Sequence, residues 1–147
     1  MTPEPQIPGY RIEEELGKGG MADVYLAVQE NLERRVAIKV LLPALFRDES
    51  LAHRFLREAR TAAGFKHPHI VDIYDVGRDE LSHYIIMEYL PGGSLSDRIK
   101  QGSLNSDQAL KIFTGLASAL DYAHGKGFIH RDVKPDNILF REDGTPV

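Results

Sequence analysis

The sequence predicts an α+β fold, in which a five-stranded antiparallel sheet with one helix precedes a mainly helical part. Short β-rich runs, several of them bounded by glycine, occur before residue 90 and are typical of strands joined by tight turns. A breaker cluster, Pro91 to Gly93, follows the last of these runs. Beyond it, apolar residues recur at helical spacing. We therefore expect the chain to change from sheet to helices near Leu90.

Composition restricts the classes of protein to which the chain can belong. Its 147 residues are 42% hydrophobic and 27% charged, which is typical of one soluble globular domain. No cysteine is present, which excludes disulfides and thiolate metal sites. The net charge of -4 comes from interspersed charges without a basic run, so we expect no nucleic-acid partner.

The N-terminus and the apolar runs indicate where the protein resides. Residues 1–9 hold three prolines and lack the basic and apolar regions of a signal peptide, so we expect a disordered lead-in. No apolar run reaches the roughly 20 residues of a membrane span. We therefore expect no membrane segment within the chain and a cytoplasmic location, with any membrane anchor beyond Val147.

The first predicted part contains five strands and one helix. Tyr10 to Val40 is expected to form three antiparallel strands, and Ile70 to Val76 and Tyr84 to Tyr89 two more. A helix is predicted over Asp48 to Ala63, with Asp48 or Ser50 as N-cap. Its apolar stripe is expected to consist of Leu51, Phe55, Ala59 and Ala62.

Two helices are predicted after the breaker cluster. Ser94 begins a Ser-x-x-Asp sequence that favours a brief helix. A longer helix is predicted to begin near Asn105 or Ser106 and to end near Gly125 or Gly127. The stripe of this helix that we expect to face a core consists of Phe113, Leu116, Ala117, Leu120 and Ala123.

The first candidate for chemistry is the glycine-rich turn between Leu16 and Val24. Glycines at such a turn let backbone N–H groups approach phosphate oxygens without obstruction by a Cβ atom. Taken alone, the turn is equally typical of a hairpin with a flexible tip. A dinucleotide-binding turn is disfavoured, because the turn leads into a strand-like run and not into a helix.

The second candidate is a strand lysine and a helix glutamate. In the run from Val36 to Val40, strand alternation places Ala37 and Lys39 on one face. A lone lysine there is most often a surface residue. Glu58, however, lies at spacings that put it near the apolar stripe of the predicted helix. Because an unpaired charge facing a core is costly, we predict an ion pair between Lys39 and Glu58.

The third candidate is the polar segment His130 to Asn137, which reads His-Arg-Asp-Val-Lys-Pro-Asp-Asn. Apolar pairs flank it on both sides, at residues 128–129 and 138–139. A polar loop held between buried anchors is well placed for chemistry. The same loop could instead be a capping turn satisfied by its own Asp and Asn side chains.

Together the glycine-rich turn, the Val-Ala-Ile-Lys strand, the helix glutamate and the His-Arg-Asp loop resemble the eukaryotic-type serine/threonine protein kinases, particularly their bacterial members. The resemblance covers nearly all of Tyr10 to Val147. It implies a kinase-like fold, with residues 10–90 as the N-lobe and residues 91–147 as a partial C-lobe that ends after the catalytic loop. It also implies transfer of the γ-phosphoryl group of Mg-ATP to a Ser or Thr hydroxyl of a protein substrate.

The resemblance assigns roles to the residues of these motifs. Lys39, oriented by Glu58, would bind the α- and β-phosphates, and Asp132 would accept the proton of the acceptor hydroxyl. Lys134 would face the γ-phosphate, and Asn137 would hold one magnesium ion. For the nucleotide it implies Leu16, Gly17, Lys18, Gly19 and Gly20 over the phosphates, Val24, Ala37 and Leu139 against the adenine ring, Glu88 and Leu90 at its edge, Met87 as gatekeeper and Ser94 near the ribose.

Two departures and two alternatives accompany the resemblance. Ala22 replaces the third glycine of the turn, and the sequence contains no Asp-Phe-Gly segment. We therefore expect the chain to be an incomplete kinase domain without activity of its own. A nucleotide-binding pseudokinase or regulatory module is the first alternative. A small-molecule kinase of the aminoglycoside phosphotransferase type is the second, and Lys134 argues against it.

Overall fold

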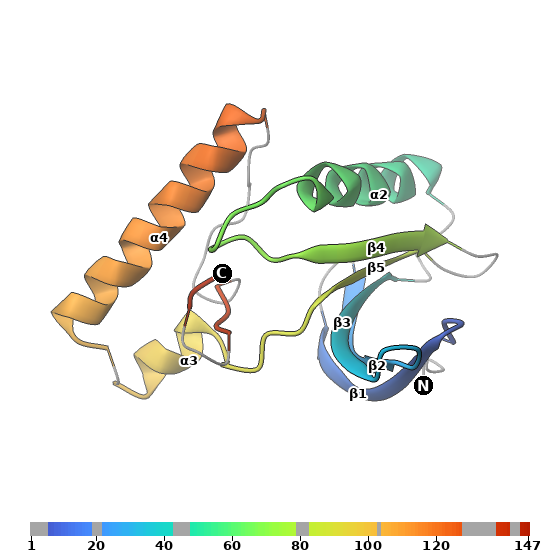
Figure 1. The fold of residues 1–147 in the computed structure, drawn as a ribbon, viewed down its shortest axis with the longest axis horizontal. Coiled ribbons are helices and arrows are strands. Elements are labelled where there is room, and N and C mark those ends of the chain that lie inside the picture. The colour runs from blue at the N-terminus through green and yellow to red at the C-terminus, as the bar shows by residue number, and fades with distance from the viewer. Residues whose placement is uncertain are drawn as a thin grey trace. The chain divides into compact units, whose positions relative to one another are not determined.

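The computed structural model describes residues 6–18, 22–42, 48–78, 83–102, 104–127, 138–141 and 145–147. Their contacts divide the chain into two units (Figure 1). The first unit consists of Met1–Gly64 and Asp72–Tyr89, and the second of Phe65–Val71 and Leu90–Val147. None of the helices in the described ranges is both long and apolar enough to cross a membrane.

The first unit is built on an antiparallel sheet of five strands, which confirms the predicted fold class. The strand order is β1-β2-β3-β5-β4. One strand begins later than predicted, because the Ile70 N–H donates to the His67 carbonyl at 3.2 Å and closes a turn before it. The strands are β1 (Tyr10–Lys18), β2 (Ala22–Gln29), β3 (Arg34–Leu41), β4 (Ile73–Arg78) and β5 (His83–Glu88).

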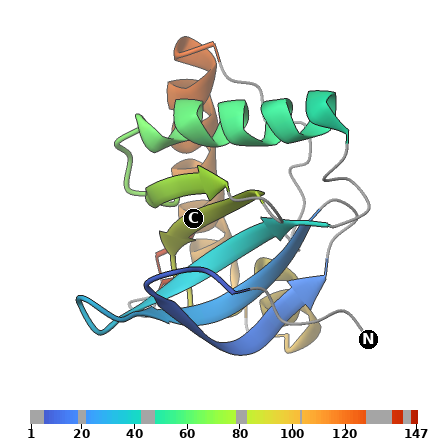
Figure 2. The ribbon, with the colours of Figure 1, turned by 90° about the vertical axis from the view of Figure 1, so that its right-hand side faces the viewer.

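The sheet curls, so that one of its faces is closed off from solvent (Figure 2). Strands β1 and β4 are the two edges of the sheet. Residues of these two edges still influence each other. Burial raises the pKa of Tyr10 on β1, and so do the Asp75 carboxylate on β4 and Tyr84 on β5. The enclosed face carries Val36 and Ile38, both fully buried. The rest of its cluster is Ile7, Ala27, Val40 and Ile86.

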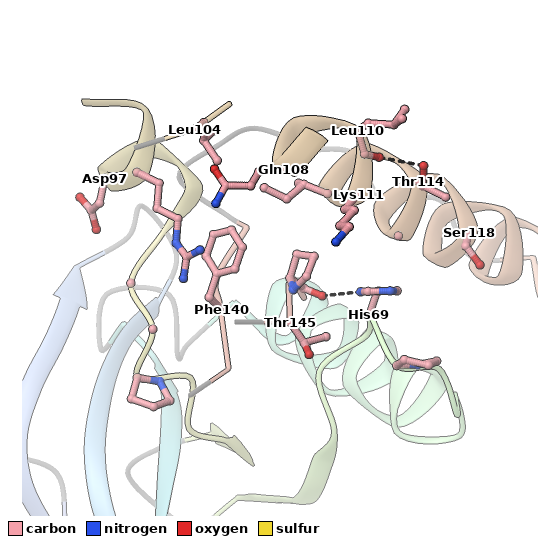
Figure 3. Close-up of a pocket in the computed structure, with 18 of the residues that line it drawn as sticks. His69, Asp97, Leu104, Gln108, Leu110, Lys111, Thr114, Ser118, Phe140 and Thr145 are labelled. Carbon is pink, nitrogen blue, oxygen red and sulfur yellow. Dashed lines mark hydrogen bonds between the residues drawn. The ribbon is translucent and has the colours of Figure 1, made fainter. Parts of the chain in front are cut away.

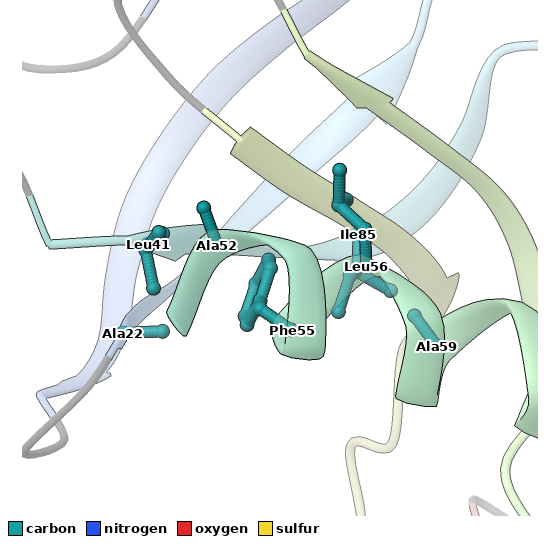
Figure 4. Packing of buried hydrophobic residues seen from close by; sticks show 7 residues of the cluster. All are labelled: Ala22, Leu41, Ala52, Phe55, Leu56, Ala59 and Ile85. Carbon is teal, nitrogen blue, oxygen red and sulfur yellow. The ribbon is translucent and has the colours of Figure 1, made fainter. Parts of the chain in front are cut away.

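Helix α2 (Glu49–Ala63) packs on the other face of the sheet. Asp48 is its N-cap, because its side chain accepts the N–H groups of Ser50 at 3.1 Å and Leu51 at 3.2 Å. The predicted stripe is confirmed at Phe55 and Ala59 and wrong at its other two positions. Leu51 and Ala62 are only half-buried, since Ala52 and Leu56 face the sheet in their place. Figure 4 shows the resulting core of Ala22, Leu41, Ala52, Phe55, Leu56, Ala59 and Ile85.

The second unit contains the two predicted helices, α3 (Leu95–Lys100) and α4 (Ser106–Gly125). Both begin with a capping box. In α3, Ser94 and Asp97 exchange hydrogen bonds of 3.1 and 3.2 Å, as the Ser-x-x-Asp sequence predicts. In α4, Asn105 and Gln108 do the same at 2.8 and 3.0 Å.

The predicted buried stripe of α4 is confirmed at Ala123, and Leu116 packs against a core cluster, but the prediction is wrong at Phe113 and Ala117. Phe113 is 65% exposed and Ala117 is exposed, whereas the buried residues are Ile112, Gly115, Ala119 and Ala123. The helix is turned by its contact with the segment Phe65–Val71, where the His69 ring lies against Gly115. A glycine makes this close approach possible, and a pattern of hydrophobic residues cannot reveal it.

Substitution of Gly115 tests this contact. A Cβ atom at Gly115 would lie 2.7 Å from Cε1 and Nε2 of His69, whose Nδ1 is held by the Pro146 carbonyl at 2.7 Å. Overpacking costs about 1 to 3 kcal/mol, against about 1 kcal/mol gained from alanine in a helix. We expect Gly115→Ala to lower the free energy of unfolding in urea by about 1 kcal/mol.

Gly125→Ala in the same helix is the matched control. A Cβ atom there meets no heavy atom within 4 Å, so we expect stability to rise by at most about 1 kcal/mol. Equal effects of the two substitutions would contradict the close packing of His69 on Gly115.

The exposed apolar side chains of α4 lead to a prediction about association. Leu110 and Phe113 are 67% and 65% exposed, and each forgoes about 1.5 to 3 kcal/mol of burial. We expect the 147-residue chain to self-associate in sedimentation, and the double variant Leu110→Ser, Phe113→Ser to dissociate. Leu32→Ser removes an exposed leucine of the first unit and serves as control. A wild-type chain that sediments as a monomer contradicts the prediction.

Candidate active site

The first unit places an apolar platform beside a lysine on the face of the sheet that carries α2. In the register of the strands, Ala37 on β3 lies between Leu26 on β2 and Met87 on β5. Two residues further along β3, Lys39 lies between Val24 and Ile85. Directly opposed residues have Cβ atoms about 4.5 to 5.5 Å apart. Val24, Ala37, Lys39 and Met87, which were predicted to bind the nucleotide, are therefore neighbours.

The two β3 residues on this face have different environments, although strand alternation puts them on the same side of the sheet. Ala37 is 6% exposed, and its small side chain adds little height between its neighbours. Lys39 is exposed, so its ammonium group is hydrated and can meet an anion without a large desolvation cost. A row of apolar side chains with an ammonium group two residues further along the strand matches the two ends of a planar ring attached to a charged chain.

Glu58 lies on α2, but it does not pair with Lys39 in this structure. The ion pairs within the described ranges are Arg11–Glu13 at 3.7 Å and Glu15–Lys18 at 4.0 Å. Glu58 is exposed, so the reasoning that a carboxylate near the core needs a cation is wrong. The pair was predicted without the condition of a bound nucleotide, and this structure does not contain it.

The glycine-rich turn is described up to its tip. Gly17 pairs with Val24 and Lys18 with Asp23, while a register irregularity lies between Glu15 and Gly17. Leu16, within that irregularity, is 41% exposed. Gly19 and Gly20 lie outside the described residues.

Ala22, the departure from the third glycine, has a structural explanation. It is buried and belongs to the core under α2, together with Leu41 and Phe55. A methyl group at this position adds apolar contact that glycine could not supply.

The end of β5 is fixed by two hydrogen bonds within the first unit. The Glu88 N–H donates to the Asp72 carbonyl at 2.9 Å, and the Asp72 N–H donates to Glu88 Oε1 at 3.2 Å. The N–H of Glu88 is thus occupied by a partner within the first unit. Leu90, the other predicted edge contact, is half-buried at the start of the second unit's main segment.

In the second unit, Ser94 and Leu139 lie opposite each other. They form an isolated antiparallel bridge, supported by the hydrogen bond from the Leu95 N–H to the Ile138 carbonyl at 2.8 Å. Ser94 Oγ accepts the Asp97 N–H at 3.1 Å, so this hydroxyl already serves as a helix cap. It retains its proton for donation to a ligand.

The remaining predicted residues lie outside the described ranges. These are Asp132, Lys134 and Asn137. Within the described residues no group of three His, Cys, Asp or Glu side chains could hold a metal ion. Asn137, the predicted magnesium ligand, lies outside the described residues.

The anchoring of the segment Phe65–Val71 in the second unit was not predicted. The Lys66 N–H donates to the Tyr122 hydroxyl at 3.1 Å, and His67 Nε2 and Ser118 Oγ are hydrogen-bonded at 2.9 Å. Arg141 donates to the Pro68 carbonyl. The polar run Lys-His-Pro-His was the sequence signal for this anchoring. Its hydrogen-bond partners lie more than 50 residues further along the chain, so the run alone could not identify them.

The comparison with known families decides what this arrangement belongs to. A sequence model described as "Protein kinase domain" matches residues 10–146. The chain belongs to the protein kinase domain family. This match confirms the kinase-like fold class, and the bacterial relatives confirm the resemblance to bacterial serine/threonine kinases.

Several bacterial kinases are similar to this kinase chain. Serine/threonine-protein kinase PknJ of Mycobacterium tuberculosis is 45% identical over 131 residues, which cover 89% of the chain and 22% of PknJ. Probable serine/threonine-protein kinase PknB of Lactococcus lactis is 46% identical over 138 residues, 92% of the chain and 22% of that protein. For PrkC of Bacillus subtilis the identity is 43% over 137 residues, 92% and 21%. The chain thus spans between a fifth and a quarter of the length of such relatives.

Proposed function

We propose that the chain provides the nucleotide-binding part and the catalytic loop of a serine/threonine protein kinase. Such an enzyme transfers the γ-phosphoryl group of Mg-ATP to a Ser or Thr hydroxyl of a protein substrate. The observation that carries the proposal is the position of Lys39 beside the platform of Leu26, Ala37 and Met87. The names of the bacterial relatives support the acceptor class.

The residues of the first unit fit an adenine nucleotide. Val24, Ala37 and Met87 would hold the ring by apolar contact, and the Lys39 ammonium would neutralise charge on the phosphates. The backbone at Gly17 and Lys18 would cover the phosphates from the hairpin side. We propose that Glu58 pairs with Lys39 when phosphates are bound, because both side chains are exposed and neither has another ion-pair partner among the described residues.

Residues of the second unit have proposed roles of their own. Leu139 is proposed to contact the adenine ring and Ser94 the ribose, since the two are held side by side. Asp132 would accept the proton of the acceptor hydroxyl, and Lys134 would bind the γ-phosphate. Magnesium, when bound through Asn137, would supply further charge neutralisation at the phosphates.

We also propose that the 147-residue chain binds nucleotide weakly and transfers no phosphate by itself, because its sequence contains no Asp-Phe-Gly. The alternative is a nucleotide-binding pseudokinase or regulatory module. The open Lys39–Glu58 pair is the observation that favours it. A longer form of the protein that binds ATP tightly and yields no phosphorylated product would support the alternative.

The proposal is tested by an NMR titration of the isotopically labelled chain with ATP and magnesium. We expect the amide signals of Val24, Ala37, Lys39 and Met87 to move together, while the enclosed face around Ile38 stays unchanged. Adenosine should move the platform signals with a smaller effect on Lys39. Movement confined to other residues, or none at saturating ATP, would contradict nucleotide binding at this face.

A further inference from the structure

A close approach of two chain segments in the second unit holds together two residues with proposed roles at the nucleotide. Ser94, proposed to contact the ribose, lies opposite Leu139, proposed to contact the adenine ring. Two backbone hydrogen bonds between the segments, of 2.8 and 3.0 Å, flank this pair. Antiparallel residues flanked in this way form a non-hydrogen-bonded pair, with Cα atoms about 4.5 Å apart. The two side chains therefore leave the same face of the paired segments as close neighbours.

Two glycines form a bulge directly before Ser94. The Gly92 N–H donates to the Phe140 carbonyl at 2.8 Å, and the Phe140 N–H donates to the Gly93 carbonyl at 3.0 Å. Two residues of one segment thus lie opposite a single residue of the other, as in a β-bulge. Because a β-bulge bends its strand and changes the direction of nearby side chains, this bulge fixes where the Ser94 side chain points.

Gly92 is the position at which the two segments leave no room for a side chain. A Cβ atom there would lie 2.7 Å from Cβ and the carbonyl oxygen of Phe140, and 2.8 Å from the carbonyl oxygen of Arg141. Non-bonded carbon atoms prefer about 3.5 to 4.0 Å. Phe140 is 1% exposed, and the Arg98 guanidinium carbon lies 3.6 Å from the centroid of its ring. Figure 3 shows Phe140 beside the chain that leads into α3. A side chain at Gly92 must therefore push the two segments apart.

Gly93 serves the bulge through its backbone conformation. Its φ is 79°, in the left-handed region that glycine adopts without steric cost. A Cβ atom there would have Asp97 Oδ2 as its nearest neighbour, at 3.6 Å, which is an ordinary contact distance. The two glycines are thus required for different reasons, Gly92 for space and Gly93 for its φ angle.

We propose that this bulge positions Ser94 against Leu139, so that the ribose and the adenine ring of one nucleotide can contact both. Gly92 and Gly93 are then positioning residues of the nucleotide site, an inference that rests on the proposed function. The Ser94 hydroxyl accepts the Asp97 N–H and keeps its own proton for a ribose hydroxyl. Displacement of Ser94 removes that hydrogen bond, while the apolar contacts of the ring remain. The bulge therefore makes the site selective for nucleotides that carry ribose hydroxyls.

The test compares ATP with 2′,3′-dideoxy-ATP, which lacks both ribose hydroxyls. NMR titrations of the 147-residue chain in magnesium give the two dissociation constants. We expect ATP to bind about fivefold more tightly, the effect of one hydrogen bond. Gly92→Ala should reduce this ratio to less than about twofold, and Ser94→Ala should reduce it equally. A merely structural effect of Gly92→Ala would lower the binding-competent fraction, which weakens both nucleotides by the same factor and leaves the ratio unchanged.

Gly125→Ala is the matched control for this ratio. It makes the same substitution in the same unit, where a Cβ atom meets no heavy atom within 4 Å, so the full ratio should remain. Gly93→Ala is a second, milder variant that should also lower the ratio, and it decides the question if Gly92→Ala does not fold.

Two kinds of failure are distinguishable. An unchanged ratio in the Gly92→Ala and Gly93→Ala variants, or a ratio near one in the unsubstituted chain, overturns the role of the bulge and leaves nucleotide binding intact. Failure of the unsubstituted chain to bind either nucleotide contradicts the proposed function, and this inference with it.

Discussion

Asp132→Asn is expected to lower the turnover number by roughly 10²- to 10⁴-fold, which is the range for loss of a general base. ATP affinity should stay nearly unchanged, because the Asp132 carboxylate is proposed to act on the acceptor hydroxyl and not on the nucleotide. A suitable enzyme is residues 1–147 joined to the corresponding remainder of the relative PrkC. Phosphate incorporation into a generic basic protein gives the turnover number, and nucleotide titration gives the affinity.

Asp136→Asn is the matched control for this prediction. It makes the same chemical change in the same polar loop, at a residue without a proposed role, so turnover should change little. If ATP affinity fell in proportion to the rate in Asp132→Asn, the residue would act in the ground state, and its assignment as general base would be wrong.

The second large effect is expected at Lys39. Removal of one preorganised group that stabilises transition-state charge costs about 10²- to 10³-fold in rate, and Lys39→Met should lose at least this much. Thermal unfolding should stay close to that of the wild type, because Lys39 is exposed and makes no ion pair within the described residues.

Arg35→Met tests whether any cation on this strand suffices. Arg35 lies four residues before Lys39 on β3 and is also exposed, so strand alternation puts both on one face. We expect near wild-type turnover for Arg35→Met. Turnover of Lys39→Met near the wild-type level would refute the role of Lys39 in phosphoryl transfer.

Local patterns predicted the elements and their starts well. Strand alternation around Val36 to Lys39 placed Ala37 and Lys39 on one face, and side-chain caps at Asp48, Ser94 and Asn105 fixed the starts of three helices. These signals act within a few residues, so one sequence contains them completely. The platform of the candidate site follows from the same alternation.

Long-range packing set the features that were predicted wrongly. The buried face of α4 depends on the contact between Gly115 and the His69 ring. These two residues are distant in the sequence, and neither is strongly hydrophobic. The exposure of Glu58 depends on the rotation of α2 about its own axis on the sheet. A rotation equal to one residue is enough to move a side chain from the core to the surface. The periodicity of apolar residues alone predicts neither the buried face of α4 nor the rotation of α2.

The most direct test of the account is affinity labelling of Lys39 by an acyl phosphate of ATP, which transfers its acyl group to a lysine beside the bound phosphates. The labelled 147-residue chain is digested, and the modified lysines are identified by mass spectrometry with and without excess ATP. We predict that Lys39 is the main modified lysine and that ATP suppresses its modification while leaving Lys100 and Lys126 unaffected. Labelling of Lys39 that ATP does not suppress, or suppression only at other lysines, would contradict a nucleotide site on this face of the sheet.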